Sequence, residues 1–386
     1  MATYKFDTMS QSDATGFTSS DTLIFTDDAA APGNVVVTEG TTTTTLTFGT
    51  KSLIFAQASL AEADITFSSA FEAGKDSQLV LGTSGADDVD TNFGSDGSVG
   101  YGLKGDDTVD ATGGTGADYL FGGLGNDTLL GGAGNDHLYG LDLTGDGTAD
   151  GADSIDGGAG NDYIQGNGGN DTLIGGTEND RINGGGGDDS ITGNAGLDVI
   201  NGNKGNDVID GGAGNDEVRG GQGDDSVSGG ADNDLVLGDL GNDTVVGGTG
   251  IDLLTGGAGN DVFVFAAGDA DLAATSGALK GLVDTITDMA SGDKIDIDTT
   301  LTDIHFQSSG VTFSTYTAAL THAQGLYDTD GNDNSIVYAM QVGADTYLFY
   351  DTDAAGTDLD SAILLQGIDA KTFFDADAPN GRFLNA

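Results

Sequence analysis

The chain of 386 residues contains no cysteine, which excludes a disulfide framework, a thiolate metal site and a thiol nucleophile. Positive charge is scarce, because 11 lysines and arginines stand against 63 aspartates and glutamates. The formal net charge of −52 excludes unaided binding to nucleic acid or to an anionic membrane. Such a chain repels itself, so either a cationic partner joins its fold or the chain stays disordered.

Long apolar segments are also missing. No run approaches the ~18 consecutive apolar residues that a membrane-spanning helix needs. The first ten residues, MATYKFDTMS, lack the basic segment and the apolar stretch of a secretory signal peptide. We therefore expect no membrane-spanning helix, and we expect any export to depend on a signal other than an N-terminal one.

Glycine and aspartate are abundant, and in the middle of the chain they recur with a period of nine. From Asp153 to Asp261 every ninth residue is an aspartate, thirteen in unbroken register. We call these aspartates the anchors. Asp118, Asp127 and Asp136 form an earlier run with the same spacing, and Asp87 and Asp107 belong to looser repeats.

Two further columns keep phase with the anchors. An apolar residue lies two positions after each regular anchor, and glycine lies two positions before it except at Glu178 and Asp232. Three columns that stay in phase for more than a hundred residues argue against the disorder that an acidic, glycine-rich composition otherwise suggests.

The glycines indicate a demand of the backbone. They permit positive φ and hence tight turns whose carbonyl groups can face inward. Where the second glycine of a repeat is replaced, the substitutes are mostly Asn167, Asn194, Asn203 and Asp239, types that tolerate the left-handed region. We expect the three residues around the apolar position to form a very short strand with one side chain facing inward.

Apolar burial alone cannot hold such repeats together. One buried aliphatic side chain contributes about 1.5–3 kcal/mol, whereas ordering the backbone costs about 1–2 kcal/mol for each of nine residues. Carboxylate and carbonyl oxygens at a fixed spacing are ligands for a hard cation, and a flexible oxygen-only set favours Ca²⁺ over Mg²⁺. The sequence therefore predicts a fold that depends on bound calcium.

The repeat at 211–219, GGAGNDEVR, shows the pattern G-G-x-G-x-D-x-U-x, where U is apolar. It resembles the nonapeptide of repeats-in-toxin (RTX) proteins, and the resemblance covers roughly residues 85–265. It implies a parallel β-roll in which two repeats form one 18-residue turn and anchors 18 apart share a calcium ion. The thirteen regular anchors then imply eleven sites or more, and eleven ions carry 22 positive charges.

The same resemblance implies the metal ligands, which are the anchor carboxylates and the carbonyl groups of neighbouring turn residues. The geometry of the sites beside Glu178 and Asp232 is in doubt, because both depart from the glycine pattern. The implied carboxylate ligands are Asp107, Asp118, Asp127, Asp136, Asp153, Asp162, Asp171, Asp180, Asp189, Asp198, Asp207, Asp216, Asp225, Asp234, Asp243, Asp252 and Asp261. The implied turn glycines are Gly125, Gly134, Gly160, Gly169, Gly187, Gly205, Gly214, Gly223, Gly241 and Gly259.

An insert interrupts the register between Asp136 and Asp153. From Asp142 the sequence DLTGDGTADGAD matches positions 1, 3, 5, 6 and 12 of an EF-hand calcium loop, although its flanks are not helical. Asp142 and Asp146 are therefore candidate ligands of an additional calcium ion. The alternative is a plain Gly/Asp surface loop.

The flanks of the repeats complete an all-β fold class: a parallel β-roll (RTX solenoid) with an N-terminal β cap domain and a C-terminal β-rich closing domain. Residues 1–80 contain short β-type runs separated by turn residues, and we assign them to a cap or assembly domain. We assign residues 81–265 to the roll and 266–386 to the C-terminal domain. The runs that predict strands are 23–25, 35–37, 46–48, 53–55, 65–67, 79–81, 262–265, 294–297, 337–338 and 347–350, and the one expected helix lies at 315–325.

The C-terminal region resembles the domain that closes the β-roll of serralysin-type secreted proteases. The residues that carry the likeness are NDVFVF at 260–265, DTITD at 284–288 and GDKIDI at 292–297. This likeness implies an uncleaved C-terminal signal for type I secretion, and hence an extracellular or cell-surface location.

The sequence argues against an enzyme. It lacks the H-E-x-x-H helix on which the serralysin chemistry depends, and its three histidines, His137, His305 and His322, are scattered. We expect His137 to be an exposed strand residue. The favoured interpretation is a secreted structural protein that self-assembles with calcium into a surface layer (S-layer) or a biofilm-matrix filament, with itself and the secretion machinery as partners. The alternatives are a monomeric calcium-dependent adhesin or glycan-binding module and, less favoured, a secreted enzyme of unfamiliar type.

Overall fold

The structure is a computed structural model. It describes residues 3–5, 22–25, 36–39, 43–48, 51–56, 65–68, 76–81, 86–91, 97–141, 150–266, 269, 283–290, 292–297, 305–314, 316–329, 336–350, 359 and 361–368. Two compact units divide the chain, unit 1 at residues 1–194 and unit 2 at residues 195–386.

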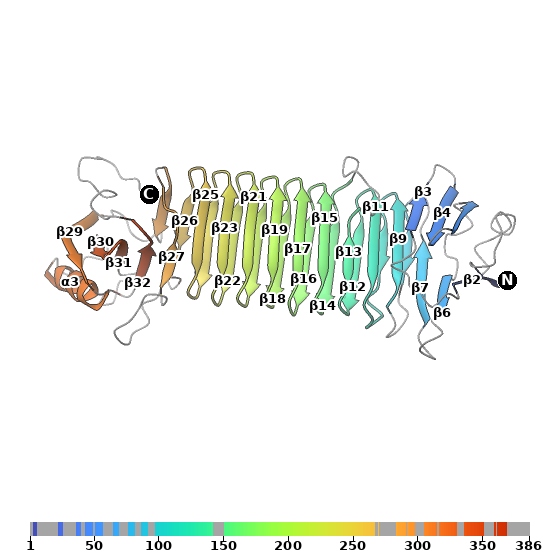
Figure 1. Cartoon of the computed structure of the whole chain (residues 1–386), viewed down its shortest axis with the longest axis horizontal. Coiled ribbons are helices and arrows are strands. Elements are labelled where there is room, and N and C mark those ends of the chain that lie inside the picture. Colours follow the sequence, from blue (N-terminus) through green and yellow to red (C-terminus); the bar gives the residue numbers. More distant parts are fainter. Residues whose placement is uncertain are drawn as a thin grey trace. The chain divides into compact units, whose positions relative to one another are not determined.

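The repeats of unit 1 form parallel strands that alternate between two sheets (Figure 1). Each strand pairs with the next but one along the chain, so that Ile155 of one strand lies in register with Leu173. The strands are β8 (Asp88–Asp90), β9 (Val99–Lys104), β10 (Thr108–Asp110), β11 (Tyr119–Leu124), β12 (Thr128–Ala133), β13 (His137–Tyr139), β14 (Ser154–Ala159), β15 (Tyr163–Gly168), β16 (Thr172–Thr177), β17 (Arg181–Gly186) and β18 (Ser190–Ala195).

Short strands precede the repeats in unit 1: β1 (Thr3–Lys5), β2 (Thr22–Phe25), β3 (Val36–Glu39), β4 (Thr43–Phe48), β5 (Lys51–Ala56), β6 (Ile65–Ser68) and β7 (Asp76–Leu81). Strands β1, β2, β6 and β7 lead into the sheet of β9 through the parallel pairing of β7 with β9. In contrast, β3, β4 and β5 form an antiparallel sheet of their own within the described residues. The strands predicted in residues 1–80 are therefore confirmed.

Unit 2 repeats the arrangement with the same register. Its strands are β19 (Val199–Lys204), β20 (Val208–Ala213), β21 (Glu217–Gln222), β22 (Ser226–Ala231), β23 (Leu235–Leu240), β24 (Thr244–Thr249), β25 (Leu253–Ala258), β26 (Val262–Phe265), β27 (Asp284–Ile286) and β28 (Lys294–Ile297). Parallel pairs continue past the last recognisable repeat, because β27 pairs with β25 and β28 pairs with β26.

The C-terminal part of unit 2 consists of β29 (His305–Phe313), α3 (Tyr316–Thr329), β30 (Ile336–Val342), β31 (Asp345–Tyr350) and β32 (Ser361–Leu365). Ala319 and Ala323 of α3 pack into a buried cluster with Tyr338, Met340 and Phe349. β32 pairs with both β31 and β27, so it joins this sheet to the repeats of the same unit. The predicted helix is confirmed, and it begins one residue later and ends four residues later than expected.

The core of the repeats is the column of apolar residues two positions after the anchors. Side chains alternate across a strand, so this residue and the first glycine of the next repeat face inward while their neighbours face out. Each of these side chains is 2% exposed or less. They are Leu120, Leu129, Leu138, Ile155, Ile164, Leu173, Ile182 and Ile191 in unit 1, and Ile200, Ile209, Val218, Val227, Val236, Val245, Leu254 and Phe263 in unit 2.

These observations confirm the all-β class and the parallel solenoid. The prediction of a three-residue strand is wrong, because the regular strands run for six residues. The Gly-Gly-x segment, residues 211–213 in β20, continues the pairing with the next strand of the same sheet. Among the described residues, no helix has the length and apolar character needed to cross a membrane.

Aromatic rings stack across neighbouring strands on the outer face of unit 1. The ring of His137 lies 4.6 Å from Tyr119 and 5.6 Å from Tyr163, and Phe121 lies 4.5 Å from Tyr101. Register causes this stacking, because Tyr119, His137 and Tyr163 occupy paired positions. His137 is therefore half-buried rather than exposed as predicted, and burial lowers its pKa.

Candidate metal centres

The anchors lie in the turns that precede the strands, and their carboxylates point into the molecule. The seventeen predicted anchors are 4% exposed or less. One carboxylate oxygen, Oδ1, accepts the backbone N–H of the anchor one turn earlier: the N–H of Asp198 donates to Asp216 at 2.8 Å, and that of Asp207 donates to Asp225 at 2.8 Å. A ladder of hydrogen bonds thus holds each carboxylate in one orientation.

The second carboxylate oxygen, Oδ2, is buried and has no hydrogen-bond partner in the part of the chain that the structure describes. A buried carboxylate oxygen without a partner costs several kcal/mol, so a whole row of ionised carboxylates is stable only with cations beside it. The row comprises Oδ2 of Asp107, Asp118, Asp127, Asp136, Asp153, Asp162, Asp171, Asp180, Asp189, Asp198, Asp207, Asp216, Asp225, Asp234, Asp243, Asp252, Asp261 and Asp284.

Carbonyl oxygens approach the same space as the unpartnered Oδ2. A Cβ atom placed on Gly211 would stand 2.5 Å from the carbonyl oxygen of Gly229 and 2.7 Å from Oδ2 of Asp216. Gly220 has the same surroundings, with Oδ2 of Asp225 and the carbonyl oxygen of Gly238 as neighbours. The first glycine of the repeat is therefore needed because a side chain would fill the space that these oxygens face.

The glycine two positions before each anchor serves the turn. All ten glycines predicted at this position have φ between +125° and +155°. Glu178 and Asp232 adopt positive φ as well, at +72° and +78°. The anchors that follow them keep the ladder, since Asp180 accepts the N–H of Asp162 at 2.9 Å and Asp234 accepts that of Asp216 at 2.8 Å. The turn is thus retained at both departures from the glycine pattern.

Burial raises the pKa of the anchor carboxyls. The pKa rises to about 6 for Asp216 and Asp225, to about 7 for Asp234 and Asp243, and to about 9 for Asp153. Desolvation is the main cause in each case, neighbouring carboxylates add to it, and the N–H donated to Oδ1 opposes it. Without a cation, the interior of the repeats therefore disfavours the ionised carboxylates.

A second ladder, which the sequence analysis missed, runs along the outside of the turns. The Asn or Asp immediately before an anchor accepts the N–H of its counterpart one turn later: Asn206 from Asp224 at 2.8 Å, Asp224 from Asn242 at 2.8 Å, and Asn242 from Asn260 at 3.0 Å. The frequent Asn and Asp at this position was the available signal. These side chains satisfy exposed backbone groups and leave the inner oxygens to the anchors.

The donor set fits a calcium ion. The buried groups that lack partners are carboxylate oxygens with carbonyl oxygens beside them, and Ca²⁺ prefers oxygen ligands in a flexible arrangement. Within the described residues, no three Asp, Glu or His side chains come close enough to hold an ion by themselves. An ion at an anchor would therefore depend on backbone carbonyls, as the resemblance to RTX repeats implies.

The structure gives each of the seventeen predicted anchors, Asp107 to Asp261, the same kind of surroundings. The two candidate ligands of the insert are not among them. Asp142 and Asp146 lie outside the described residues. Sequence analysis missed Asp284, which shares the burial and the unpartnered Oδ2 of the anchors. The available signal was the apolar Ile286 two positions later, without the preceding glycine.

Comparison with known families agrees with this geometry. Residues 112–142, 148–182, 174–209, 201–236, 210–245 and 237–272 match the family of RTX calcium-binding nonapeptide repeats. No curated protein matches the chain. The matched residues are RTX calcium-binding repeats, and they form a parallel β-solenoid.

Proposed function

We propose that this is a secreted structural protein that folds around calcium outside the cell and then assembles with copies of itself into a surface layer or matrix filament. The observation that carries the calcium-dependent part is the row of buried Oδ2 atoms without protein partners. No purely apolar account explains why a solenoid would bury a carboxylate in every turn.

The residues that would hold calcium are the anchors, through Oδ2, together with the carbonyl groups of the glycines beside them. Bound calcium supplies positive charge where desolvated carboxylates face each other. Oδ1 meanwhile keeps its backbone N–H, so in the folded chain the ladder fixes the orientation of each carboxylate while Oδ2 binds the ion. The thirteen anchors in regular register imply eleven sites or more.

The proposed extracellular location is supported by the calcium affinity of such modules and by the net charge of the chain. Extracellular calcium modules bind with Kd of about 10⁻⁴–10⁻³ M, so they stay empty at the submicromolar calcium of a cell interior. A chain with a net charge of −52 would remain expanded there, which suits passage through a type I secretion channel. RTX repeat proteins are typically secreted, which supports the same location.

Circular dichroism during a calcium titration tests the calcium-dependent part. We expect a disordered spectrum in excess chelator and a β spectrum at millimolar calcium, with magnesium much less effective as the control. A β spectrum that persists in chelator would contradict the proposal.

The assembly part is supported by the separate sheet of β3, β4 and β5. Within the described residues this sheet pairs with no other strand, so β3 and β5 are edge strands that can accept a strand from a second copy. The segment is also weakly charged: residues 41–56 contain Lys51 and no Asp or Glu. By contrast, eleven calcium ions would leave the molecule with about 30 excess negative charges, so contacts between roll surfaces would be repulsive.

Electron microscopy of negatively stained protein, with and without calcium, tests assembly. We expect ordered sheets or fibres only with calcium, and we expect removal of residues 1–80 to abolish them while the calcium-dependent β spectrum remains. Assembly of the truncated protein would place the interface elsewhere in the chain.

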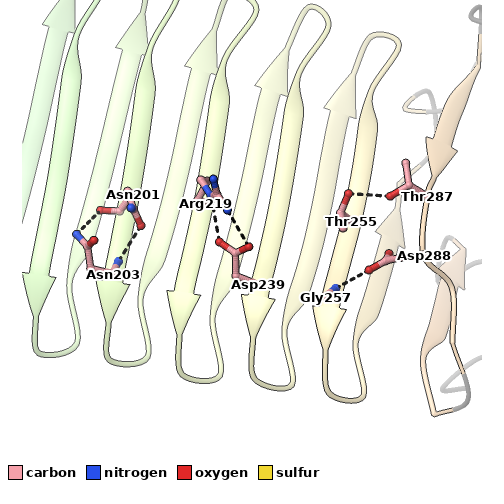
Figure 2. A network of polar contacts seen from close by, with 8 residues as sticks. All are labelled: Asn201, Asn203, Arg219, Asp239, Thr255, Gly257, Thr287 and Asp288. Carbon is pink, nitrogen blue, oxygen red and sulfur yellow. Dashed lines mark hydrogen bonds and ion pairs between the residues drawn. The ribbon is translucent and has the colours of Figure 1, made fainter.

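A specific surface favours the adhesin as a second candidate. On unit 2, Arg219 forms a bidentate ion pair with Asp239 at 3.1 Å, and the amides of Asn201 and Asn203 lie beside it (Figure 2). These residues, with Gln222 and Leu240, line a shallow hollow of about 320 Å³. Planar polar groups of this kind can bind sugar hydroxyls, and glycan-array binding by dispersed, unassembled protein would favour this function.

A further inference from the structure

The last turn of unit 2 contains an anchor that no repeat motif marks. Asp284 lies 32 residues after Asp252, beyond residues 267–282, and Leu282 occupies the position of the turn glycine. Nevertheless the N–H of Asp252 donates to Oδ1 of Asp284 at 2.8 Å, as the N–H of Asp198 does to Asp216 in a regular turn. The N–H of Thr285 donates to the carbonyl of Asp252 at 2.8 Å, and Ile286 is fully buried in the apolar column.

The free oxygen of Asp284 distinguishes it from its neighbours. Its side chain is 0% exposed, and Oδ2 has no hydrogen-bond partner among the described residues. Asp293 occupies the equivalent position in the other sheet and accepts the N–H of Asp261 at 3.1 Å, but its Oδ2 accepts the N–H of Ala290 at 2.6 Å. One column of anchors therefore ends at Asp293 with a satisfied carboxylate, whereas the other continues to Asp284 with an unsatisfied one.

Asp288 shows that an unsatisfied oxygen is not a general property of this region. Its two carboxylate oxygens accept the N–H groups of Gly256 at 3.0 Å and of Gly257 at 2.8 Å, and Thr255 and Thr287 bond through their hydroxyls at 2.8 Å (Figure 2). The carboxylate of Asp288 thus accepts the N–H groups of both glycines of β25. Of the carboxylates of Asp284, Asp288 and Asp293, only that of Asp284 lacks a partner for one oxygen.

Asp284 also lies at a junction. Strand β27 pairs with β25 on one side, where Leu254 lies beside Ile286, and with β32 on the other, where Asp284 lies beside Ile363. β32 in turn pairs antiparallel with β31, and β31 with β30. Whatever stabilises Asp284 in its ionised form therefore stabilises the attachment of the C-terminal sheet to the repeats of unit 2.

We infer that Asp284, together with Asp252, binds one further calcium ion beyond the matched repeats, and that this ion holds the C-terminal sheet of β29–β32 on the last turn. The inference rests on the proposed calcium binding of the anchors. It gives calcium control over a part of the chain that contains no repeat.

Native mass spectrometry at saturating calcium chloride counts the ions, and hydrogen exchange reports the two regions separately. We expect Asp284→Asn to bind one ion fewer than the wild type. The amide exchange of residues 361–365 should become about tenfold faster, while that of residues 226–231 stays unchanged. Asparagine keeps an oxygen for the N–H of Asp252, so this variant tests the charged oxygen rather than the ladder.

Asp293→Asn is the matched control, because it removes the same charge from an equivalent turn where both oxygens already have partners. We expect it to keep the wild-type ion count. An unchanged count in Asp284→Asn, an equal loss in both variants, or slower exchange of residues 361–365 in Asp284→Asn would overturn the inference. Slower exchange is the result for a buried carboxylate that no cation accompanies, since a neutral amide would then be more stable. A wild type that binds no calcium would instead refute the proposed function.

Discussion

At the scale of residues, the two carboxylate oxygens of each anchor have different surroundings. Oδ1 belongs to the backbone ladder, and Oδ2 faces the carbonyl groups beside the first glycine of the repeat. The glycines are therefore tied to the carboxylates: two positions before the anchor they permit the turn, and five positions before it they leave room for the oxygens. A repeat that lost either feature would keep its aspartate but lose the place where the aspartate acts.

Asp216→Asn tests this division. The substitution keeps an oxygen that can accept the N–H of Asp198 and removes only the charge on the other oxygen. We expect the midpoint of calcium-induced folding to move to about three- to tenfold higher calcium, because a shared ligand is weakened. Circular dichroism at a series of calcium concentrations measures the midpoint.

Glu217→Gln provides the control for Asp216→Asn. It removes the same charge from the adjacent residue, whose side chain lies on the outer face of β21. We expect its midpoint to remain within error of the wild type. Equal shifts in the two variants would mean that net charge, and not the position of the carboxylate, governs calcium binding.

At the scale of elements, no strand of the repeats is stable alone. A six-residue strand such as β20 buries one apolar side chain and one glycine, so its stability depends on the strands above, below and opposite. Parallel register places identical positions in contact, which produces the apolar column, both ladders and the ring contacts of His137 with Tyr119 and Tyr163. Each strand is therefore stabilised by its nearest neighbours, as in other solenoids.

Substitutions at two adjacent residues of β20 compare how much an inward-facing and an outward-facing side chain contribute to stability. Ile209 is 2% exposed and Val208 is 59% exposed. At saturating calcium we expect Ile209→Ala to lower the free energy of unfolding by about 2–5 kcal/mol, because it opens a cavity in the column. Val208→Ala should change it by less than about 0.5 kcal/mol. Thermal unfolding followed by circular dichroism compares them, and similar losses would show that the inward face is wrongly assigned.

At the scale of the whole molecule, charge decides when the chain folds. An excess of 52 negative charges opposes any compact state, and the buried anchors add local repulsion to it. Bound calcium would relieve both at once. Under the proposed function, the dependence on calcium is therefore a property of the entire chain, although each ion would act on only a few oxygens.

Protons should compete with calcium for the same carboxylates. The pKa values of about 6 to 7 at Asp216, Asp225, Asp234 and Asp243 lie above the ordinary 3.8, so the calcium-free fold is favoured by protonation. That contribution is complete below about pH 4 and is lost as the pH rises through 6 and 7. Calcium binding has the opposite dependence, because it needs the ionised carboxylates.

Calcium-induced folding starts from a disordered chain, whose anchors have the ordinary pKa of 3.8. The calcium midpoint should therefore stay nearly constant between about pH 7.5 and about pH 5.5 and rise as the pH falls through about 4, where calcium must displace protons. Calcium added near pH 4 should release protons, which a titration in unbuffered solution detects. A midpoint that rises about tenfold already between about pH 7.5 and about pH 5.5 would mean that the calcium-free chain is compact, with buried anchors of raised pKa.

The sequence by itself determined the repeats, the inward apolar column and the anchor positions. Local spacing carried this information, since glycine, aspartate and apolar residues recur in phase every nine positions, whereas the parallel β-roll was implied by the resemblance to RTX repeats. The conformation at Asn167 and Asn203, both with positive φ, was likewise readable from residue type. The strands of residues 1–80 and helix α3 followed from apolar runs, although with inexact boundaries.

Only the tertiary structure decided how the repeats end. Asp284 and Asp293 look alike in sequence, each followed two positions later by isoleucine. Their difference depends on whether a neighbouring N–H reaches Oδ2: the N–H of Ala290 donates to Oδ2 of Asp293, and no described group donates to Oδ2 of Asp284. The sequence also could not predict that β3, β4 and β5 form a separate sheet. The choice of strand partners depends on contacts between distant segments and not on the pattern within any one of them.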